Sequence, residues 1–199
     1  MKKAALGICV FAAACLAGAA HAQTQGGYFG AGALTASTDN AREFALATFA
    51  DSADKSASGF KVFGGYLWNQ FGIEGGYYDL GTYDVMFGGA KSDDFSVSAF
   101  TVSGVLALRM TSTFTFNAKA GIAFTSVDYR CFQACGGDFV NTSDSDIAGV
   151  FGAGVAWRPA RNFTLRADYE SIGDISHSVG LLQESFPYTI FSISAQFNF

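Results

Sequence analysis

The sequence predicts an all-β protein that folds as an eight-stranded antiparallel up-and-down transmembrane β-barrel. Half of its 199 residues are apolar and 21 are phenylalanine, yet after the first 22 residues there is no uninterrupted apolar run of the ~20 residues that a membrane helix needs. Apolar and polar residues instead alternate in segments close to the ~10 residues of a tilted membrane strand. Because lipid offers the backbone no hydrogen-bond partners, such strands must close into a barrel.

The chain starts with the pattern of an exported precursor. Met1-Lys2-Lys3 is basic, an apolar run of small residues follows, and Ala20-His21-Ala22 fits an A-x-A cleavage site. We therefore expect a signal peptide over residues 1–22 and a barrel domain over residues 23–199. The alternative is a lipoprotein anchored through Cys15, but the three alanines before this cysteine lack the larger aliphatic residue expected there.

The expected mature chain is acidic. Cleavage after residue 22 leaves 10 basic and 17 acidic side chains, a net charge of about −7. A protein of this charge, without a basic arm, is not expected to bind nucleic acid or another polyanion.

In the first four predicted strands, alternate residues face lipid and lumen. The second strand turns Phe60 and Trp68 toward lipid and Lys61 toward the lumen. The third and fourth strands turn Glu74 and Arg109 toward the lumen in the same way. These four strands are expected at residues 27–35, 60–68, 72–80 and 95–110.

The last four predicted strands repeat the pattern. Lys119 faces the lumen on the fifth strand, and Arg166, Asp168 and Glu170 form the polar row of the seventh. These strands are expected at residues 114–125, 147–157, 163–171 and 187–199. The final strand has one apolar face (Phe191, Ile193, Ala195, Phe197 and Phe199) and one polar face (Ser192, Ser194, Gln196 and Asn198).

The connections between these strands alternate in length. Three are short and rich in turn residues, and four are long and polar. In outer-membrane barrels short turns face the periplasm and long loops face outside, which fixes the expected orientation. The short connections are 69–70, 111–113 and 159–162, and the long ones are 36–59, 81–94, 126–146 and 172–186.

Several short motifs resemble the transmembrane domain of the outer-membrane protein A family. Gly59-Phe60-Lys61-Val62-Phe63-Gly64-Gly65-Tyr66 and Gly72-Ile73-Glu74-Gly75-Gly76-Tyr77-Tyr78-Asp79-Leu80-Gly81 resemble its strands two and three, and Arg166-Ala167-Asp168-Tyr169-Glu170 resembles its strand seven. The chain end, with Phe197 and Phe199, resembles the aromatic signal that the barrel-insertion machinery reads. Opacity-type adhesins and other small barrels share motifs of this kind.

The resemblance implies a lumen plugged by charged side chains. In that family a glutamate on strand three meets an arginine on strand seven, and Glu74 and Arg166 occupy these places. The family also has a lysine on strand four as a second partner for the glutamate, where this chain has Val105. This departure puts a charge-switching gate in doubt.

The inward charges have two readings. They could line an ion path, or they could form a structural salt-bridge core, which we favour because eight strands enclose an interior only just wide enough for side chains and because buried charges persist when they are paired. The predicted lumen charge cluster comprises Lys61, Glu74, Arg109, Lys119, Arg166, Asp168 and Glu170.

Two further residue types are candidate sites. Cys131 and Cys135 are the cysteines that remain after cleavage, and an exported pair favours a disulfide over a metal pair, which would lack a third ligand. His177 could suggest a lipid-modifying hydrolase, but the residue two positions beyond it is Val179 rather than serine, so we expect a loop histidine. We predict no catalytic residue, no metal and no cofactor.

These expectations leave three classes of function. The leading one is a non-enzymatic outer-membrane surface barrel, a monomer in contact with lipid and lipopolysaccharide, that supports envelope integrity and presents loops to a host or surface ligand. The second is a narrow channel for ions or very small solutes. The third, a lipid-modifying enzyme, has no supporting residue constellation.

Overall fold

The computed structural model describes residues 26–38, 52–53, 56–87, 90–131, 141–179 and 182–199. The expected signal peptide lies outside these ranges. Within them no helix is long and apolar enough to cross a membrane. The strands are β1 (Gly26–Ser37), β2 (Ser52–Ala53), β3 (Ser56–Trp68), β4 (Phe71–Phe87), β5 (Ala90–Arg109), β6 (Phe114–Cys131), β7 (Asn141–Ala160), β8 (Phe163–Val179) and β9 (Leu182–Asn198).

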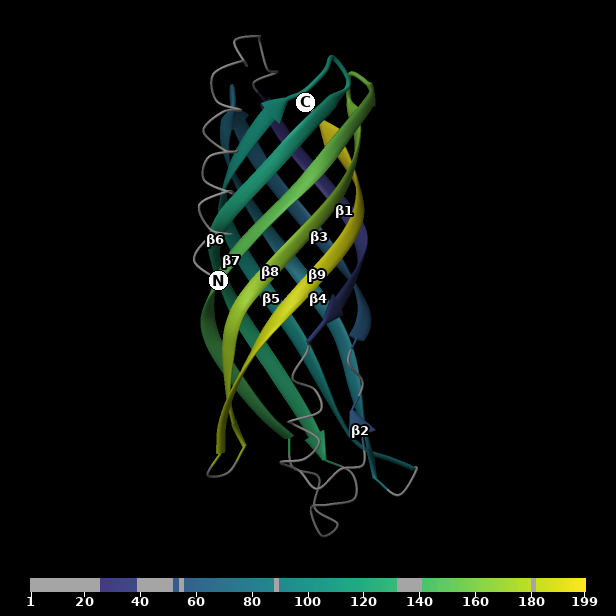
Figure 1. Cartoon of the computed structure of the whole chain (residues 1–199), viewed down its shortest axis with the longest axis vertical. Coiled ribbons are helices and arrows are strands. Elements are labelled where there is room, and N and C mark those ends of the chain that lie inside the picture. Colours follow the sequence, from purple (N-terminus) through teal and green to yellow (C-terminus); the bar gives the residue numbers. More distant parts are fainter. Residues whose placement is uncertain (1–25, 39–51, 54–55, 88–89, 132–140, 180–181) are drawn as a thin grey trace, which may run out of the picture.

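The eight long strands form a closed antiparallel barrel (Figure 1). Each pairs with its neighbour along the chain, and β1 closes the ring by pairing with both β3 and β9. The two-residue β2 adds only a short pairing to the outer part of β4. The predicted fold class is therefore confirmed, since closure leaves no free edge in the membrane.

The outer surface of the barrel is apolar, as the alternation of apolar and polar residues predicts. Phe60, Trp68, Ile73 and Tyr77 all point outward and are exposed. The residues opposite Trp68, Ile73 and Tyr77 continue the apolar surface; they are Phe71, Tyr66 and Phe100. At the short-turn end, Asn69 adopts a positive φ of 65°, which a two-residue hairpin turn requires and asparagine tolerates.

The strands are longer than expected, so the four predicted long loops were wrong in extent. Residues 82–87 pair with 90–96, residues 126–130 with 141–145, and residues 175–179 with 182–186. A strand of 20 residues such as β5 rises ~50 Å along a tilted barrel, against an apolar band ~25 Å tall. The hairpins continue into water, where lipid no longer imposes an apolar outer face.

A β-bulge on β4 changes which side chains face inward above the membrane. Asp79 pairs with Ser98 and Thr82 with Ser96, so β4 carries one extra residue. Gly81 sits in the bulge with φ 89°, and its N–H donates to the Asp79 carboxylate at 2.9 Å. The bulge shifts the parity, so that Leu80 and Tyr83 both point into the lumen and are fully buried.

Candidate functional site

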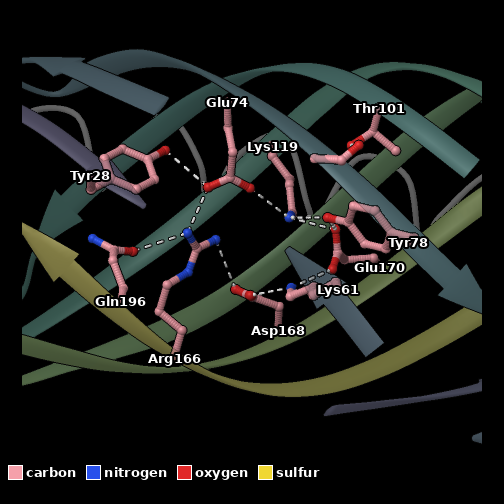
Figure 2. Close-up of polar contacts among 11 residues, drawn as sticks. Tyr28, Lys61, Glu74, Tyr78, Thr101, Lys119, Arg166, Asp168, Glu170 and Gln196 are labelled. Atoms are coloured by element: carbon pink, nitrogen blue, oxygen red, sulfur yellow. Dashed lines mark hydrogen bonds and ion pairs between the residues drawn. The ribbon is translucent and has the colours of Figure 1, made fainter. Parts of the chain in front are cut away.

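Six charged side chains converge inside the barrel from four strands (Figure 2). Lys61 comes from β3, Glu74 from β4 and Lys119 from β6, and β8 contributes Arg166, Asp168 and Glu170. The three residues on β8 are two positions apart, so they share the inward face of one strand. All six are at most 7% exposed.

Glycines on the neighbouring strand provide the room for these long side chains. Gly152 and Gly154 on β7 pair with Glu170 and Asp168 of β8. A Cβ at Gly152 would lie 2.8 Å from Cγ of Glu170 and 3.3 Å from Cγ of Lys119. A side chain at this position would collide with Glu170 and crowd Lys119.

The six charges form one closed ring in which cations and anions alternate. Arg166 contacts Glu74 at 2.6 Å and Asp168 at 3.3 Å. Lys61 contacts Asp168 at 2.8 Å and Glu170 at 2.9 Å. Lys119 closes the ring, with Glu170 at 2.5 Å and Glu74 at 3.1 Å. We call this set the charge ring; every member has two partners of opposite sign, and the ring is neutral as a whole.

Neutral side chains add hydrogen bonds to the charge ring, although the buried Nε of Arg166 has no partner among the described residues. The Tyr28 hydroxyl donates to Glu74 at 2.9 Å, and the Tyr78 hydroxyl donates to Glu170 at 2.9 Å. Arg166 also donates to the side-chain oxygen of Gln196 at 3.2 Å. Burial of carboxylates and ammonium groups is tolerated only with such pairing and hydrogen bonding.

Phe63 supplies an aromatic floor for the cations. Its ring centroid lies 4.7 Å from Cζ of Arg166 and 5.4 Å from Nζ of Lys61. Phe63 is two residues from Lys61 and shares its inward face. Cation–π contact with a desolvated ring contributes ~2 kcal/mol in favourable geometries.

Beyond the charge ring, toward the long connections, the lumen is filled by a second layer that is apolar. On β8 the inward row passes from Glu170 to Ile172, and on β9 it passes from Ser192 to Ile190 and Tyr188. The Tyr83 ring stacks on Phe95 at 4.9 Å and meets Tyr188 edge-on at 6.1 Å. We call the following buried set the apolar layer: Leu34, Ala36, Ala57, Tyr78, Leu80, Tyr83, Phe95, Val97, Ala99, Ala123, Val127, Ala148, Val150, Ile172, Tyr188 and Ile190.

On the opposite side of the charge ring, toward the short turns, the lumen narrows to a small cavity. It has a volume of about 20 Å³ and lies among Tyr28, Leu67, Val105, Arg166 and Gln196. A cavity needs ~10–15 Å³ to hold one water molecule. The space is sufficient for about one water and not for a solvated ion.

A family model identifies this architecture. The model of the OmpA-like transmembrane domain matches residues 22–189, which is most of the chain. The protein belongs to the OmpA-like transmembrane domain family. It is therefore an outer-membrane barrel.

Solved structures share the fold of this OmpA-like barrel at low sequence identity. Neisserial surface protein A is 18% identical, with a TM-score of 0.61 over 89% of this chain and 100% of that one. Ail, the attachment invasion locus protein of Yersinia pestis, is 17% identical, with a TM-score of 0.55 over 88% and 100%. OprG from Pseudomonas aeruginosa is 12% identical, with a TM-score of 0.57 over 88% and 97%. No curated protein sequence matches significantly.

The OmpA-like barrel brings together six of the seven predicted lumen charges, and Arg109 is the exception. Its inward parity is correct, but it lies six residues along β5 from Ser103, the residue opposite Glu74. At ~3.4 Å per residue this separation is ~20 Å. Alternation predicts the face of a residue and not its height along the barrel, which is why Arg109 was wrongly grouped with the others.

Lys119 takes the place of the strand-four lysine that the family has and that this chain replaces with Val105. These two residues are direct cross-strand neighbours on β5 and β6. The cation that the family resemblance led us to seek at position 105 is thus supplied from the adjacent strand, and it reaches Glu74.

Sequence reasoning missed Tyr28, Phe63, Tyr78 and Gln196 as members of the site. Phe63 and Tyr78 have the same parity as Lys61 and Glu74, and this signal could have identified them. The contact partners of each side chain depend on the stagger of the strands, which parity does not give.

The remaining predicted sites lie at the ends of strands. Phe197 and Phe199 are exposed at the short-turn end, where both rings lie near Phe29, and their role in barrel insertion stays a prediction. Cys131 is the last residue of β6, and Cys135 lies outside the described residues, so their disulfide also stays a prediction. His177 was expected in a loop but pairs with Glu184 within the β8–β9 hairpin, because this hairpin extends beyond the membrane.

Proposed function

We propose that this OmpA-like barrel is a closed, non-enzymatic surface protein that supports the outer membrane and presents its outer segments to external partners. The observation that carries the proposal is the filled lumen. A neutral ring of six ion pairs and an apolar layer lie one behind the other across the barrel. An ion would have to displace both to pass.

The lipid-facing surface supports the structural part of this proposal. Rows of exposed phenylalanine, isoleucine and tryptophan side chains surround the barrel. This apolar surface can contact lipid and lipopolysaccharide directly, without another protein. Within the described residues no group of three potential ligands could hold a metal ion.

The charge of the outer segments favours a particular class of external partner. The four segments at residues 36–59, 81–94, 126–146 and 172–186 contain 13 acidic and 4 basic side chains. Ail has been solved in complex with sucrose octasulfate, a heparin analogue. The acidic outer segments of the present chain oppose polyanion binding, so we propose a basic protein surface as its partner.

Conductance of the refolded barrel in planar bilayers tests the proposal. We expect wild-type protein to produce no resolved channels. A Glu74→Ala/Arg166→Ala double variant should produce no stable channels either, because the apolar layer still blocks the lumen. Regular conductance by wild-type protein would contradict the proposal and establish the narrow channel instead.

Surface binding tests the second part. Immobilised barrel should retain a basic peptide such as polylysine at low salt and should not retain heparin. Retention of heparin by the wild-type barrel would contradict the proposed class of partner.

A further inference from the structure

The short-turn mouth of the barrel has a chemistry unlike the rest of the molecule. A cavity of about 510 Å³ opens there between the β7–β8 turn and the ends of β1 and β9. Arg158, Arg161 and Asn162 line its wall with polar side chains, and Asn198, whose amide nitrogen donates to Thr164, lies beside them. Leu67 and the Phe199 ring make part of the same wall apolar.

Positive charge is concentrated at this mouth. Arg109 and Arg158 interact as like charges, and Arg158 and Arg161 both line the cavity. The sequence has no aspartate or glutamate at residues 95–127, 147–167 or 187–199. The charge ring does not offset this excess, because its own three cations and three anions already balance.

We propose that the short-turn mouth binds a phosphate group, and that the source is the headgroup of an anionic phospholipid in the periplasmic leaflet. Guanidinium groups form paired, charge-assisted hydrogen bonds with phosphate oxygens. The cavity volume lies within the ~300–1,000 Å³ typical of small-molecule sites. Phe199 is 74% exposed at the rim, so an acyl chain leaving the headgroup can cross its ring into the membrane.

The position in the membrane supports a lipid source over a free anion. Short turns of outer-membrane barrels face the periplasm, so the mouth is level with the headgroups of the inner leaflet. Trp68 and Trp157, which are exposed beside these turns, are the side chains that favour this boundary.

Binding to refolded barrel in phosphatidylcholine nanodiscs, followed by the fluorescence of Trp157, tests the proposal. The ligands are short-chain phosphatidylglycerol and inorganic phosphate. We expect saturable binding of phosphatidylglycerol that weakens with salt. Arg158→Gln and Arg161→Gln should each weaken it by about 10-fold or more, since a hydrogen bond to a charged group contributes ~1.5–3 kcal/mol and 1.4 kcal/mol is tenfold.

Arg130→Gln, the same change at the opposite end of the barrel, is the matched control and should bind like wild type. Folding of every variant is checked by the gel shift of the intact barrel. Binding of inorganic phosphate as tightly as phosphatidylglycerol would overturn the lipid source. Equal binding by wild type and Arg158→Gln/Arg161→Gln, or equal loss in Arg130→Gln, would overturn the site itself.

Discussion

The charge ring and the apolar layer both block the lumen, but different interactions hold them in place. The charge ring depends on direction: each ion needs both partners at hydrogen-bond distance, and Lys61 and Glu170 are fully buried. The apolar layer depends on volume, with rings such as Tyr83 and Phe95 in stacked contact. Buried ion pairs are sensitive to loss of one partner, whereas apolar cores tolerate changes that keep their volume. The two layers should therefore respond differently to substitution.

The largest effect is expected in the charge ring. Glu74→Ala and Arg166→Ala should each lower the free energy of unfolding by about 3–5 kcal/mol, because each leaves a buried charge with one partner fewer. The double variant should cost clearly less than the sum of the two. Urea unfolding followed by tryptophan fluorescence measures all three, with the exposed Arg161→Ala as control. Strict additivity would show that the two side chains do not interact.

A smaller effect is expected at the bulge that shapes the apolar layer. Gly81→Ala should destabilise the barrel by about 1–3 kcal/mol, because alanine is strained at positive φ and its Cβ would lie 2.5 Å from the Ser58 carbonyl oxygen. The same unfolding measurement applies, and Gly75→Ala, where the added Cβ would make only an ordinary contact 3.8 Å from the Thr101 carbonyl oxygen, is the matched control. Equal stability of the two variants would contradict the assigned role of the bulge.

The hairpin beyond the apolar layer should contribute little. A disulfide between Cys131 and Cys135 would close a short loop, for which chain-entropy models give at most about 2 kcal/mol. Mass measurement before and after reduction and alkylation detects the bond. Two free thiols in freshly isolated protein would refute it.

The smallest effect is expected within the apolar layer itself. Ile190→Val should cost only about 0.5–1.5 kcal/mol, since one buried methyl group is removed and the layer can relax. Asp168→Asn, an equally small change in the charge ring, should cost more because Arg166 and Lys61 both lose a charged partner. If Ile190→Val lowers the free energy of unfolding as much as Asp168→Asn does, the two layers do not differ in their sensitivity to substitution.

The same difference explains how much could be predicted from the sequence. Eight strands, their pairing order and the inward face of Lys61, Glu74 and Lys119 follow from alternation, because lipid imposes it on every membrane strand. The apolar layer breaks this alternation: Leu80 and Tyr83 are apolar on the inner face, and the extra residue at Gly81 shifts the parity between them. Residues 81–94, Tyr83 among them, consequently resembled a loop, although Leu80 was placed correctly at the end of the third strand. Partner choice within the charge ring depends on strand stagger, which no local pattern encodes.

The connectivity of the charge ring has a consequence for the order of folding. Glu74 and Arg166 are 92 residues apart in the chain, and the ring joins β3, β4 and β6 to β8. Lys119 and Glu74 can pair before β8 is in place, but both partners of Lys61 come from β8, so this charge is neutralised only when that strand adds. We expect the contacts to β8 to form late, and interactions that form after the transition state chiefly slow unfolding. The charge ring should therefore lower the rate of unfolding of the finished barrel more than it raises the rate of folding.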